Sequence, residues 1–174
     1  MNTLWENIIA GDKDAYSTAY LEFYRRFYSY GLKFSPEVAL VEDVIQETLL
    51  FIWFERKRFA GIVNPEGYCF SVFRNNLFRK IKDHTKRLSI EGRQEADPEF
   101  SRDCLLIEQE TEKELCQTLK AAIEGLSSRQ REIIFLRFYE GLSYEQIAFT
   151  MDITIKATYK LAGRALLKLK EKLL

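Results

Sequence analysis

The chain has 174 residues, of which 47% are hydrophobic and 30% are charged. This length allows one ordinary domain or two small ones, and the apolar content excludes a disordered chain. The formal net charge is zero, which at first sight argues against a nucleic-acid-binding protein, because such proteins usually carry a basic excess.

The zero net charge hides a segregation of charge along the chain. Residues 1–50 carry four basic and eight acidic side chains, net −4, and residues 51–87 carry nine and three, net +6. Residues 88–114 carry three and nine, net −6, and residues 115–174 carry ten and six, net +4. Two basic blocks with an acidic block between them indicate two separate contacts with an anionic partner.

Motifs for catalysis, metals and cofactors are missing from the sequence. Cys69, Cys104 and Cys116 are widely spaced and include no CxxC pair, so we expect free thiols and neither a disulfide framework nor a zinc site. His84 has no ligand-like partner three or four residues further on, which favours a surface role over catalysis. Since GxxxxGKS/T, GxGxxG and GxSxG motifs are also missing, we expect no enzyme and no cofactor.

No run of apolar residues approaches the roughly 20 that a helix needs to span a bilayer. The first residues, MNTLWENIIAGDKD, also lack the basic and apolar stages of a signal peptide. We therefore expect a cytoplasmic protein without direct membrane insertion.

Helical periodicity begins near residue 12 and continues through two predicted helices. The first covers residues 12–34 and has an aromatic stripe that is predicted to lie in the core. The second covers residues 36–58, with Ser35 as its cap and Pro36 in its first turn. The aromatic stripe comprises Tyr16, Tyr20, Phe23, Phe27 and Tyr30, and the inward side of the second helix comprises Val41, Val44, Ile45, Thr48, Leu49, Ile52 and Trp53.

The other edge of the second helix is polar and mostly acidic. Glu42, Asp43, Gln46 and Glu47 form a strip about one and a half turns long. By composition alone this strip is a solvated face, which is the default for an amphipathic helix.

Aromatic and basic side chains are interleaved in the third predicted helix, which Asn64 and Pro65 open and which continues to about residue 88. Unpaired bases can stack on aromatic rings and guanidinium planes while neighbouring cations hold the sugar-phosphate chain. The structural alternative puts the phenylalanines in the core and the cations on the surface, and one helix can do both. The aromatic residues are Tyr68, Phe70, Phe73 and Phe78, and the cations are Arg74, Arg79, Lys80, Lys82, Lys86 and Arg87.

The periodicity fades over residues 89–110, which are acidic and contain Gly92 and Pro98, so we predict a flexible linker there. Extended, its roughly 21 residues could span about 70 Å, enough for two domains to contact well-separated segments of DNA. Residues 111–126 and 127–139 then predict two helices that face each other. The facing residues are Leu115, Leu119, Ala122 and Ile123 on the first and Ile133, Ile134, Leu136 and Phe138 on the second.

Residues 141–174 predict two helices joined by a very short turn, an arrangement that can place one helix in the major groove of DNA. Ser143 and Gln146 form a capping box at the start of the first helix. Asp152 and Ile153 form the turn, and Thr154 caps the second helix.

The second of these helices has an apolar face and a basic row. The basic residues are four apart and therefore neighbours, which suits a phosphate backbone. Short side chains near the amino end would let this helix approach base edges. A solvated amphipathic helix is the structural alternative. The predicted inward residues are Ile155, Tyr159, Ala162, Leu166, Leu169 and Leu173; the basic row is Lys156, Lys160, Arg164, Lys168 and Lys172; the short side chains are Thr154, Ala157 and Thr158.

These elements predict an all-α protein with two small helical domains joined by an acidic linker. The first domain covers residues 1–88, the linker residues 89–110 and the second domain residues 111–174. The second is predicted to be a four-helix domain that contains the helix-turn-helix.

The motifs resemble those of the sigma-70 family of bacterial RNA polymerase initiation factors, specifically its extracytoplasmic-function (ECF) group. Residues 126–169 resemble the domain that reads the promoter −35 element. VEDVIQETLLFIW, residues 41–53, resembles the polymerase-binding helix, and NPEGYCFSVFRNNLFRKIKD, residues 64–83, resembles the helix that opens and reads the −10 element. The resemblance implies a sigma factor that brings core RNA polymerase to promoter DNA, with an anti-sigma factor as a further partner.

The resemblance also implies roles for individual residues on three surfaces. Contacts with the polymerase fall to Asp43, Gln46 and Glu47. Contacts with the −10 element fall to Tyr68, Arg74, Asn75, Arg79, Lys80 and Lys82. Contacts with the −35 element fall to Arg137, Ser143, Thr154, Lys156, Ala157, Thr158, Lys160 and Arg164.

Two other functions fit the same residues. An ordinary helix-turn-helix regulator would bind duplex DNA without polymerase and use its first 90 residues for sensing or dimerisation. An interaction module would hold polymerase or an anti-sigma factor without opening a promoter. Arg79 favours this second alternative slightly, since many members of the resembled family have an aspartate at that position.

Overall fold

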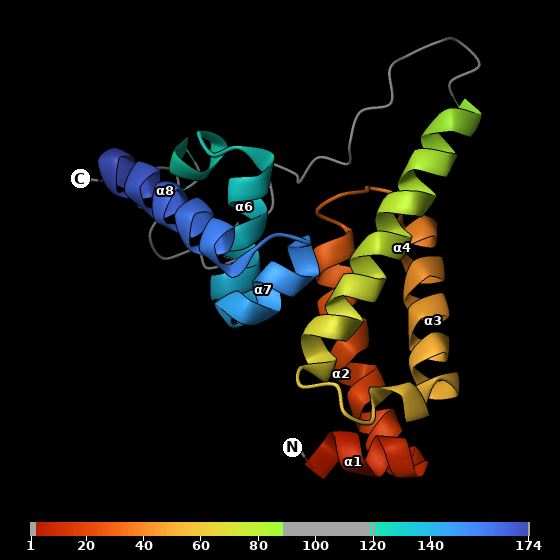
Figure 1. Ribbon diagram of the computed structural model, residues 1–174. Helices are drawn as coiled ribbons and strands as arrows, with labels where there is room; N and C mark the ends of the chain where they lie inside the picture. Colours follow the sequence, from red (N-terminus) through yellow and green to blue (C-terminus); the bar gives the residue numbers. More distant parts are fainter. Residues whose placement is uncertain (1–2, 89–118, 120, 174) are drawn as a thin grey trace, which may run out of the picture. The chain divides into compact units, whose positions relative to one another are not determined.

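The computed structural model describes residues 3–88, 119 and 121–173, and every regular element in these ranges is helical. The chain divides into two compact units, Met1–Pro98 and Glu99–Leu174, which we describe separately (Figure 1). The all-α fold class is therefore confirmed. The predicted linker and most of the helix predicted over residues 111–126 lie outside the described residues.

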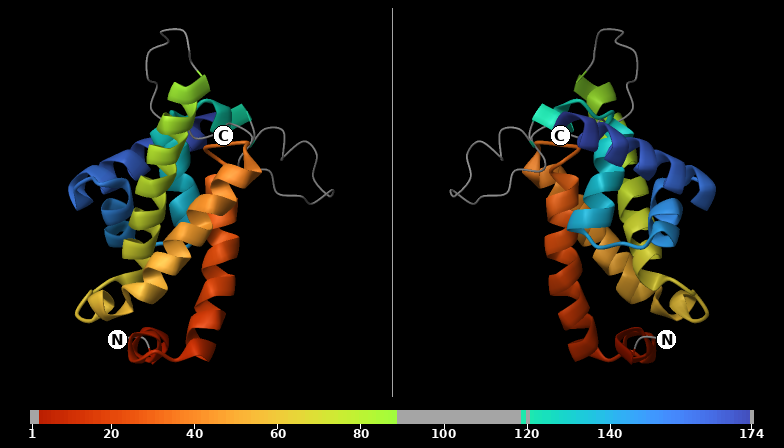
Figure 2. Two further views of the ribbon diagram at one scale, coloured as in Figure 1. Left: turned by 90° about the vertical axis from the view of Figure 1, so that its right-hand side faces the viewer. Right: turned by 90° about the vertical axis from the view of Figure 1, so that its left-hand side faces the viewer.

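Unit 1 is built around three long helices, α2 (Lys13–Gly31), α3 (Val38–Phe54) and α4 (Pro65–Leu88), which lie against one another (Figures 1 and 2). Its shorter elements are α1 (Thr3–Ala10) and the 3₁₀ helix η1 (Arg56–Phe59). The Asp12 side chain caps α2, because its Oδ1 accepts hydrogen bonds from the amides of Asp14 at 2.8 Å and Ala15 at 3.1 Å.

Aromatic rings from α2 and α4 fill the centre of unit 1. The Phe27 and Phe73 rings are stacked with their centroids 4.3 Å apart, and Phe70 meets Phe27 edge to face at 5.1 Å. Phe23, Phe27 and Tyr30 are buried as predicted, whereas Tyr16 and Tyr20 are only half-buried at the edge of the stripe. Each such ring pair contributes about 0.5–1.5 kcal/mol to stability, in addition to the contribution from burying the apolar area of the rings.

The inward side predicted for α3 is largely confirmed, but the helix is shorter than predicted at both ends. Its six buried residues are Val41, Val44, Ile45, Thr48, Leu49 and Ile52, while Trp53 is half-buried. Ser35 does not cap the helix directly: its Oγ accepts from the Glu37 amide at 3.2 Å and Glu37 becomes the N-cap. After Phe54 the backbone tightens into η1, where the Arg56 guanidinium lies 4.6 Å from the Trp53 ring centroid.

The sequence patterns missed α1. Its eight residues are too few to be stable by helix propensity alone, and tertiary packing holds them instead. Trp5 and Ile8 are buried, and the Trp5 ring stacks on Phe59 of η1 with centroids 5.4 Å apart.

Unit 2 contains α6 (Ser128–Ile134), the π-helix η2 (Phe135–Tyr139), α7 (Tyr144–Met151) and α8 (Ile155–Leu173), preceded by a helical segment at 121–124. The predicted single helix over 127–139 is thus α-helical only as far as Ile134. Phe138 was predicted to face inward, but it is 62% exposed. The extra residue in the π turn, closed by a hydrogen bond from the Glu140 amide to the Phe135 carbonyl at 3.0 Å, changes the direction of the side chains that follow.

None of the helices in the described part of the chain is long and apolar enough to cross a membrane. Cys69 is a buried free thiol, as predicted, while Cys104 and Cys116 lie outside the described ranges.

Candidate nucleic-acid interface

The helix-turn-helix of unit 2 has the local structure that its sequence predicts. The Gln146 amide donates to Ser143 Oγ at 3.2 Å, and the Ser143 amide donates to Gln146 Oε1 at 2.6 Å, which completes the capping box of α7. Asp152 ends α7 in a left-handed conformation, with φ 53° and ψ 53°. Thr154 Oγ1 then accepts from the Ala157 amide at 3.2 Å and caps α8.

The buried face of α8 differs from the predicted one. Thr158, Ala162 and Ala165 are buried, at spacings of four and three residues. Four of the predicted inward residues are instead at least 40% exposed: Ile155, Tyr159, Leu166 and Leu173. Because the buried residues are small, the backbone of α8 can approach the rest of the unit closely, and the larger apolar side chains are displaced outward.

Because the buried face of α8 differs from the predicted one, one predicted DNA contact, that of Thr158, is wrong. The Thr158 side chain is fully buried, and its Oγ1 donates to the Thr154 carbonyl at 3.1 Å. It therefore cannot reach a base edge from this position.

The remaining predicted residues of α8 lie on its exposed side. Lys156, Ala157, Lys160 and Arg164 are exposed, as is the cap residue Thr154. The row continues along the helix to Lys172, whose ammonium is 3.3 Å from the Ala121 carbonyl, which ties the end of the row to its own unit. The row from Lys156 to Lys168 is thus the part open to a partner.

Arg137 and Ser143 support this surface from within unit 2. Arg137 Nη1 donates to the Leu142 carbonyl at 2.9 Å, and its guanidinium lies 5.0 Å from the Tyr144 ring centroid. Tyr144 in turn meets Tyr159 of α8, with centroids 4.5 Å apart. The apolar pattern placed Tyr159 in the core, but its side chain is 52% exposed. Tyr159 is therefore an additional residue of the exposed surface of α8.

In unit 1 the acidic strip of α3 is exposed. Asp43, Gln46 and Glu47 are all exposed and Glu42 is half-buried. The same strip extends towards the end of the helix through Leu50 and Phe54, which are 54% and 72% exposed. The sequence did not single out these two, although their spacing from Gln46 places them on one side of the helix.

The six residues of α4 predicted to meet the −10 element do not all share one side of the helix. Tyr68, Asn75, Arg79 and Lys82 recur at seven, four and three residues and so share a helix side. Tyr68 packs edge to face on Phe59 with centroids 5.4 Å apart, and Arg79 donates to Asn76 Oδ1 at 3.2 Å. The Arg74 guanidinium lies 4.1 Å from the Phe78 ring centroid.

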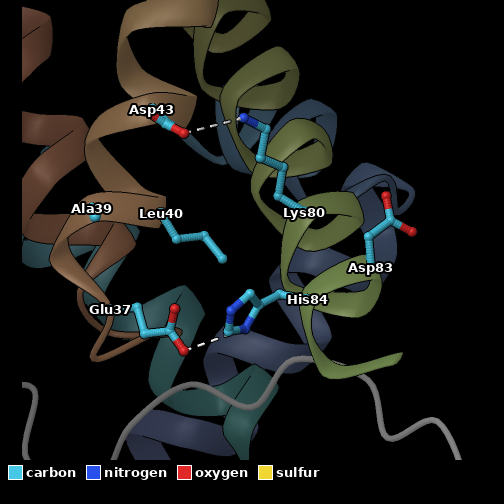
Figure 3. A pocket seen from close by; sticks show the side chains of 7 residues that line it. All are labelled: Glu37, Ala39, Leu40, Asp43, Lys80, Asp83 and His84. Atoms are coloured by element: carbon cyan, nitrogen blue, oxygen red, sulfur yellow. Dashed lines mark ion pairs between the residues drawn. The ribbon is translucent and has the colours of Figure 1, made fainter. Parts of the chain in front are cut away.

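Lys80 faces α3 instead. Its ammonium is 2.7 Å from Glu47 Oε1 and 3.8 Å from Asp43 Oδ2. Below it, His84 Nδ1 is 3.3 Å from Glu37 Oε1. A pocket of about 400 Å³ lies between the two helices (Figure 3), and its lining residues are Glu37, Ala39, Leu40, Asp43, Lys80, Asp83 and His84.

Two family models match the chain. The model "Sigma-70 region 2" matches residues 19–87, and "Sigma-70, region 4" matches residues 116–169. The "ECF RNA polymerase sigma factor SigL" of Mycobacterium tuberculosis is 31% identical over 143 residues, which cover 79% of this chain and 78% of the relative.

Two solved structures share the fold. CnrH, in complex with the cytosolic domain of CnrY, aligns with a TM-score of 0.61 and 18% identity over 97% of this chain and 94% of that one. The sigma factor RpoE of Bartonella quintana, in complex with the anti-sigma factor NepR, aligns with a TM-score of 0.62 and 22% identity over 90% of this chain and 95% of that one. Since both sigma-70 regions are matched in order and the SigL relative covers most of the chain, the protein belongs to the ECF group of the sigma-70 family, the RNA polymerase sigma factors that direct core polymerase to promoters and promote strand opening.

Proposed function

We propose that the two units divide promoter recognition between them. Unit 1 binds core polymerase and the −10 element, and unit 2 reads the −35 element. The single observation that carries this division is the exposed basic row of α8, which begins at a capped amino end in a helix-turn-helix. That geometry supports insertion of α8 into the major groove.

On the −35 side, Lys156, Lys160 and Arg164 contact phosphates, and Thr154 and Ala157 let the end of α8 approach base edges. The exposed Tyr159 adds an aromatic ring to this surface. Arg137 and Ser143 act at the start of α7, where Arg137 supports Tyr144 and Ser143 fixes the helix cap. Thr158 is left out because it is buried.

On the −10 side, Tyr68, Asn75, Arg79 and Lys82 form the surface that meets the melted strand. Arg74, which precedes Asn75 in the chain and lies over the Phe78 ring, is a further contact. Bases that leave the duplex cost a few kcal/mol of unstacking, which contacts with aromatic and basic side chains offset. The interleaving of rings and cations on α4 supports this role.

Core polymerase binds the exposed strip Asp43, Gln46 and Glu47, and we add Leu50 and Phe54 as its apolar continuation. An anti-sigma factor is a further partner, by analogy with the complexes of CnrH and of the Bartonella RpoE. The chain itself performs no covalent chemistry and acts in the cytoplasm, where core polymerase and promoter DNA are found.

The test is run-off transcription with purified core polymerase. Sequencing the transcripts that increase when the chain is overproduced would identify the promoters. Each promoter would then be transcribed by core polymerase alone and by core polymerase with the added chain. A promoter-specific product that needs the chain supports the proposal.

The same templates separate the alternatives. Duplex binding without any transcript would favour a helix-turn-helix regulator. Binding to polymerase that gives neither a transcript nor an open complex would favour an interaction module, and permanganate footprinting of the −10 region detects the open complex.

A further inference from the structure

A seam of opposite charges joins α3 to α4 in unit 1 (Figure 3). Asp43 and Glu47 lie one turn apart on α3, and both approach Lys80 of α4, at 3.8 and 2.7 Å. The Lys80 side chain is 29% exposed, while those of Asp43 and Glu47 are 72% and 52% exposed. The Lys80 side chain is therefore less exposed than the two acidic side chains that approach it.

The seam continues one turn further along α4. His84 Nδ1 lies 3.3 Å from Glu37 Oε1, at the start of α3. Between the two pairs, Leu40 lines the pocket of about 400 Å³. Lys80 is thus one member of an organised contact between two helices, and its ammonium is directed towards α3 and away from the side that carries Asn75 and Arg79.

The Lys80 ammonium and the carboxylates of Asp43 and Glu47 pair with each other, and each is also a candidate contact for an external partner. Under the proposed function, on which this inference rests, Asp43 and Glu47 bind polymerase. The sequence also predicted a contact of Lys80 with the −10 strand, although Lys80 faces α3 in this structure. An ammonium beside two carboxylates attracts a phosphate less strongly, because the carboxylates repel the phosphate and partly offset the ammonium charge. Conversely, a carboxylate held by Lys80 is less available to a basic group of the polymerase.

We propose that Lys80, Asp43 and Glu47 form an autoinhibitory latch that couples polymerase binding to capture of the −10 strand. In the free chain the latch is closed and weakens both contacts. When polymerase binds the carboxylates, Lys80 loses its ion pairs and can contact the DNA phosphates. Because coupling free energies are reciprocal, DNA that takes Lys80 also strengthens polymerase binding.

The size of the coupling follows from the exposure of the groups. Ion pairs at a protein surface contribute modestly, so opening the latch should change an affinity by about 2- to 5-fold. The latch therefore biases the order of binding events without preventing either of them.

The first experiment measures binding of the full chain to core polymerase without DNA. Lys80→Ala should tighten binding by about 2- to 5-fold, because it frees both carboxylates. Arg79→Ala is the matched control: it removes the same charge one residue away, from a side chain that bonds to Asn76 and not to α3. Equal effects of the two variants would overturn the latch. This result does not depend on whether Lys80 contacts DNA.

The second experiment measures binding of the free chain to a labelled single-stranded thymidine oligonucleotide of about 12 nucleotides by fluorescence anisotropy. Lys80→Ala is compared in two backgrounds, the natural chain and the double variant Asp43→Asn, Glu47→Gln. The latch predicts little loss in the natural chain and a loss of about 2- to 5-fold in the double variant. A second background, Asp14→Asn with Glu22→Gln on α2, makes the same charge change away from Lys80 and should behave like the natural chain.

The outcomes separate the latch from the proposed function. An equal loss in all backgrounds would overturn the latch and leave the DNA contact of Lys80 standing. No loss in any background would show that Lys80 does not contact DNA, and it would overturn the latch while leaving the contacts of the proposed function standing.

Discussion

Three small side chains determine how α8 lies in its unit. Thr158, Ala162 and Ala165 are buried at 0–3% exposure, and they form the side of α8 that contacts α6 and α7. Small residues let two helix backbones approach closely, and dense packing leaves little room for added atoms. The neighbouring Gly163, by contrast, has no atom within 4 Å of the position that a Cβ would take.

Two adjacent substitutions should therefore act in opposite directions. Ala162→Leu should destabilise unit 2 by about 1–3 kcal/mol, because the larger side chain overfills the contact. Gly163→Ala should stabilise unit 2 by about 0.5–1 kcal/mol, because alanine lowers the backbone entropy of the unfolded chain and creates no clash in the folded helix. Urea unfolding followed by circular dichroism measures both. Destabilisation by both variants would contradict the assigned faces of α8.

Tyr16 gives unit 1 a dependence on alkaline pH. Its hydroxyl donates to the Leu49 carbonyl at 2.8 Å, and burial, followed by the nearby Tyr20, raises the pKa of Tyr16 to about 12. A raised pKa means that the protonated phenol is stabilised in the folded state. Its contribution is complete below the ordinary pKa of about 10 and is lost as the pH rises towards 12.

Tyr16→Phe should lower the stability of unit 1 by about 1 kcal/mol near neutral pH, through the lost hydrogen bond. Between about pH 10 and pH 12 the difference from the natural chain should shrink, because the natural chain loses the Tyr16 contribution there. Urea unfolding across this range measures the difference. Tyr139→Phe, at a ring that is 66% exposed, serves as the control. A difference that stays constant with pH would count against the role of Tyr16.

The short helix α1 depends on its packing against the rest of unit 1. Trp5 is 5% exposed and lies between the Phe59 ring at 5.4 Å and the Phe23 ring at 5.9 Å. Trp5→Ala should cost about 3–5 kcal/mol, the usual range for removing a large buried ring. Thermal unfolding followed by circular dichroism tests this, with the exposed Glu6→Ala as a control on the same helix. A cost below 1 kcal/mol would mean that α1 contributes little to the core.

The elements that sequence patterns predicted best are those with local causes. The capping box of Ser143 and Gln146 and the cap at Thr154 depend on residues within three positions, so the sequence alone identifies them. The inward side of α3 followed from its apolar period in the same way.

The sequence-based predictions were wrong where contacts between distant residues, a change of helical period or side-chain size determine the structure. α1 is held by Phe59 and Phe23, which lie far along the chain. The π turn at Phe135–Tyr139 changes the helical period, so Phe138 was placed inside. On α8 the apolar pattern identified Ala162 but otherwise favoured larger residues, whereas close packing also selected Thr158 and Ala165. The prediction of an exposed basic row survived this error, because a lysine row is visible in the sequence whichever apolar face is buried.

A net charge of zero is compatible with binding DNA because charges of each sign are gathered on separate surfaces. Asp43 and Glu47 are exposed on α3, while Lys156, Lys160 and Arg164 are exposed on α8. Exposed charges are screened beyond about 8–10 Å at physiological salt. A partner therefore meets the local charge of each surface, and the whole-chain sum says little about binding.

The salt dependence of −35 binding should report directly on the α8 row. Replacing Lys156, Lys160 and Arg164 by alanine removes up to three phosphate contacts, and each contact contributes about 0.9 to the slope of log affinity against log salt. The slope should become shallower by about 2.7, as measured by titrating a duplex that contains the −35 element at several salt concentrations. The control replaces Lys13, Lys57 and Lys170, which are also exposed but lie outside the row, and removes the same charge. If the control flattens the slope as much as the row variant, net charge and not the row holds the duplex.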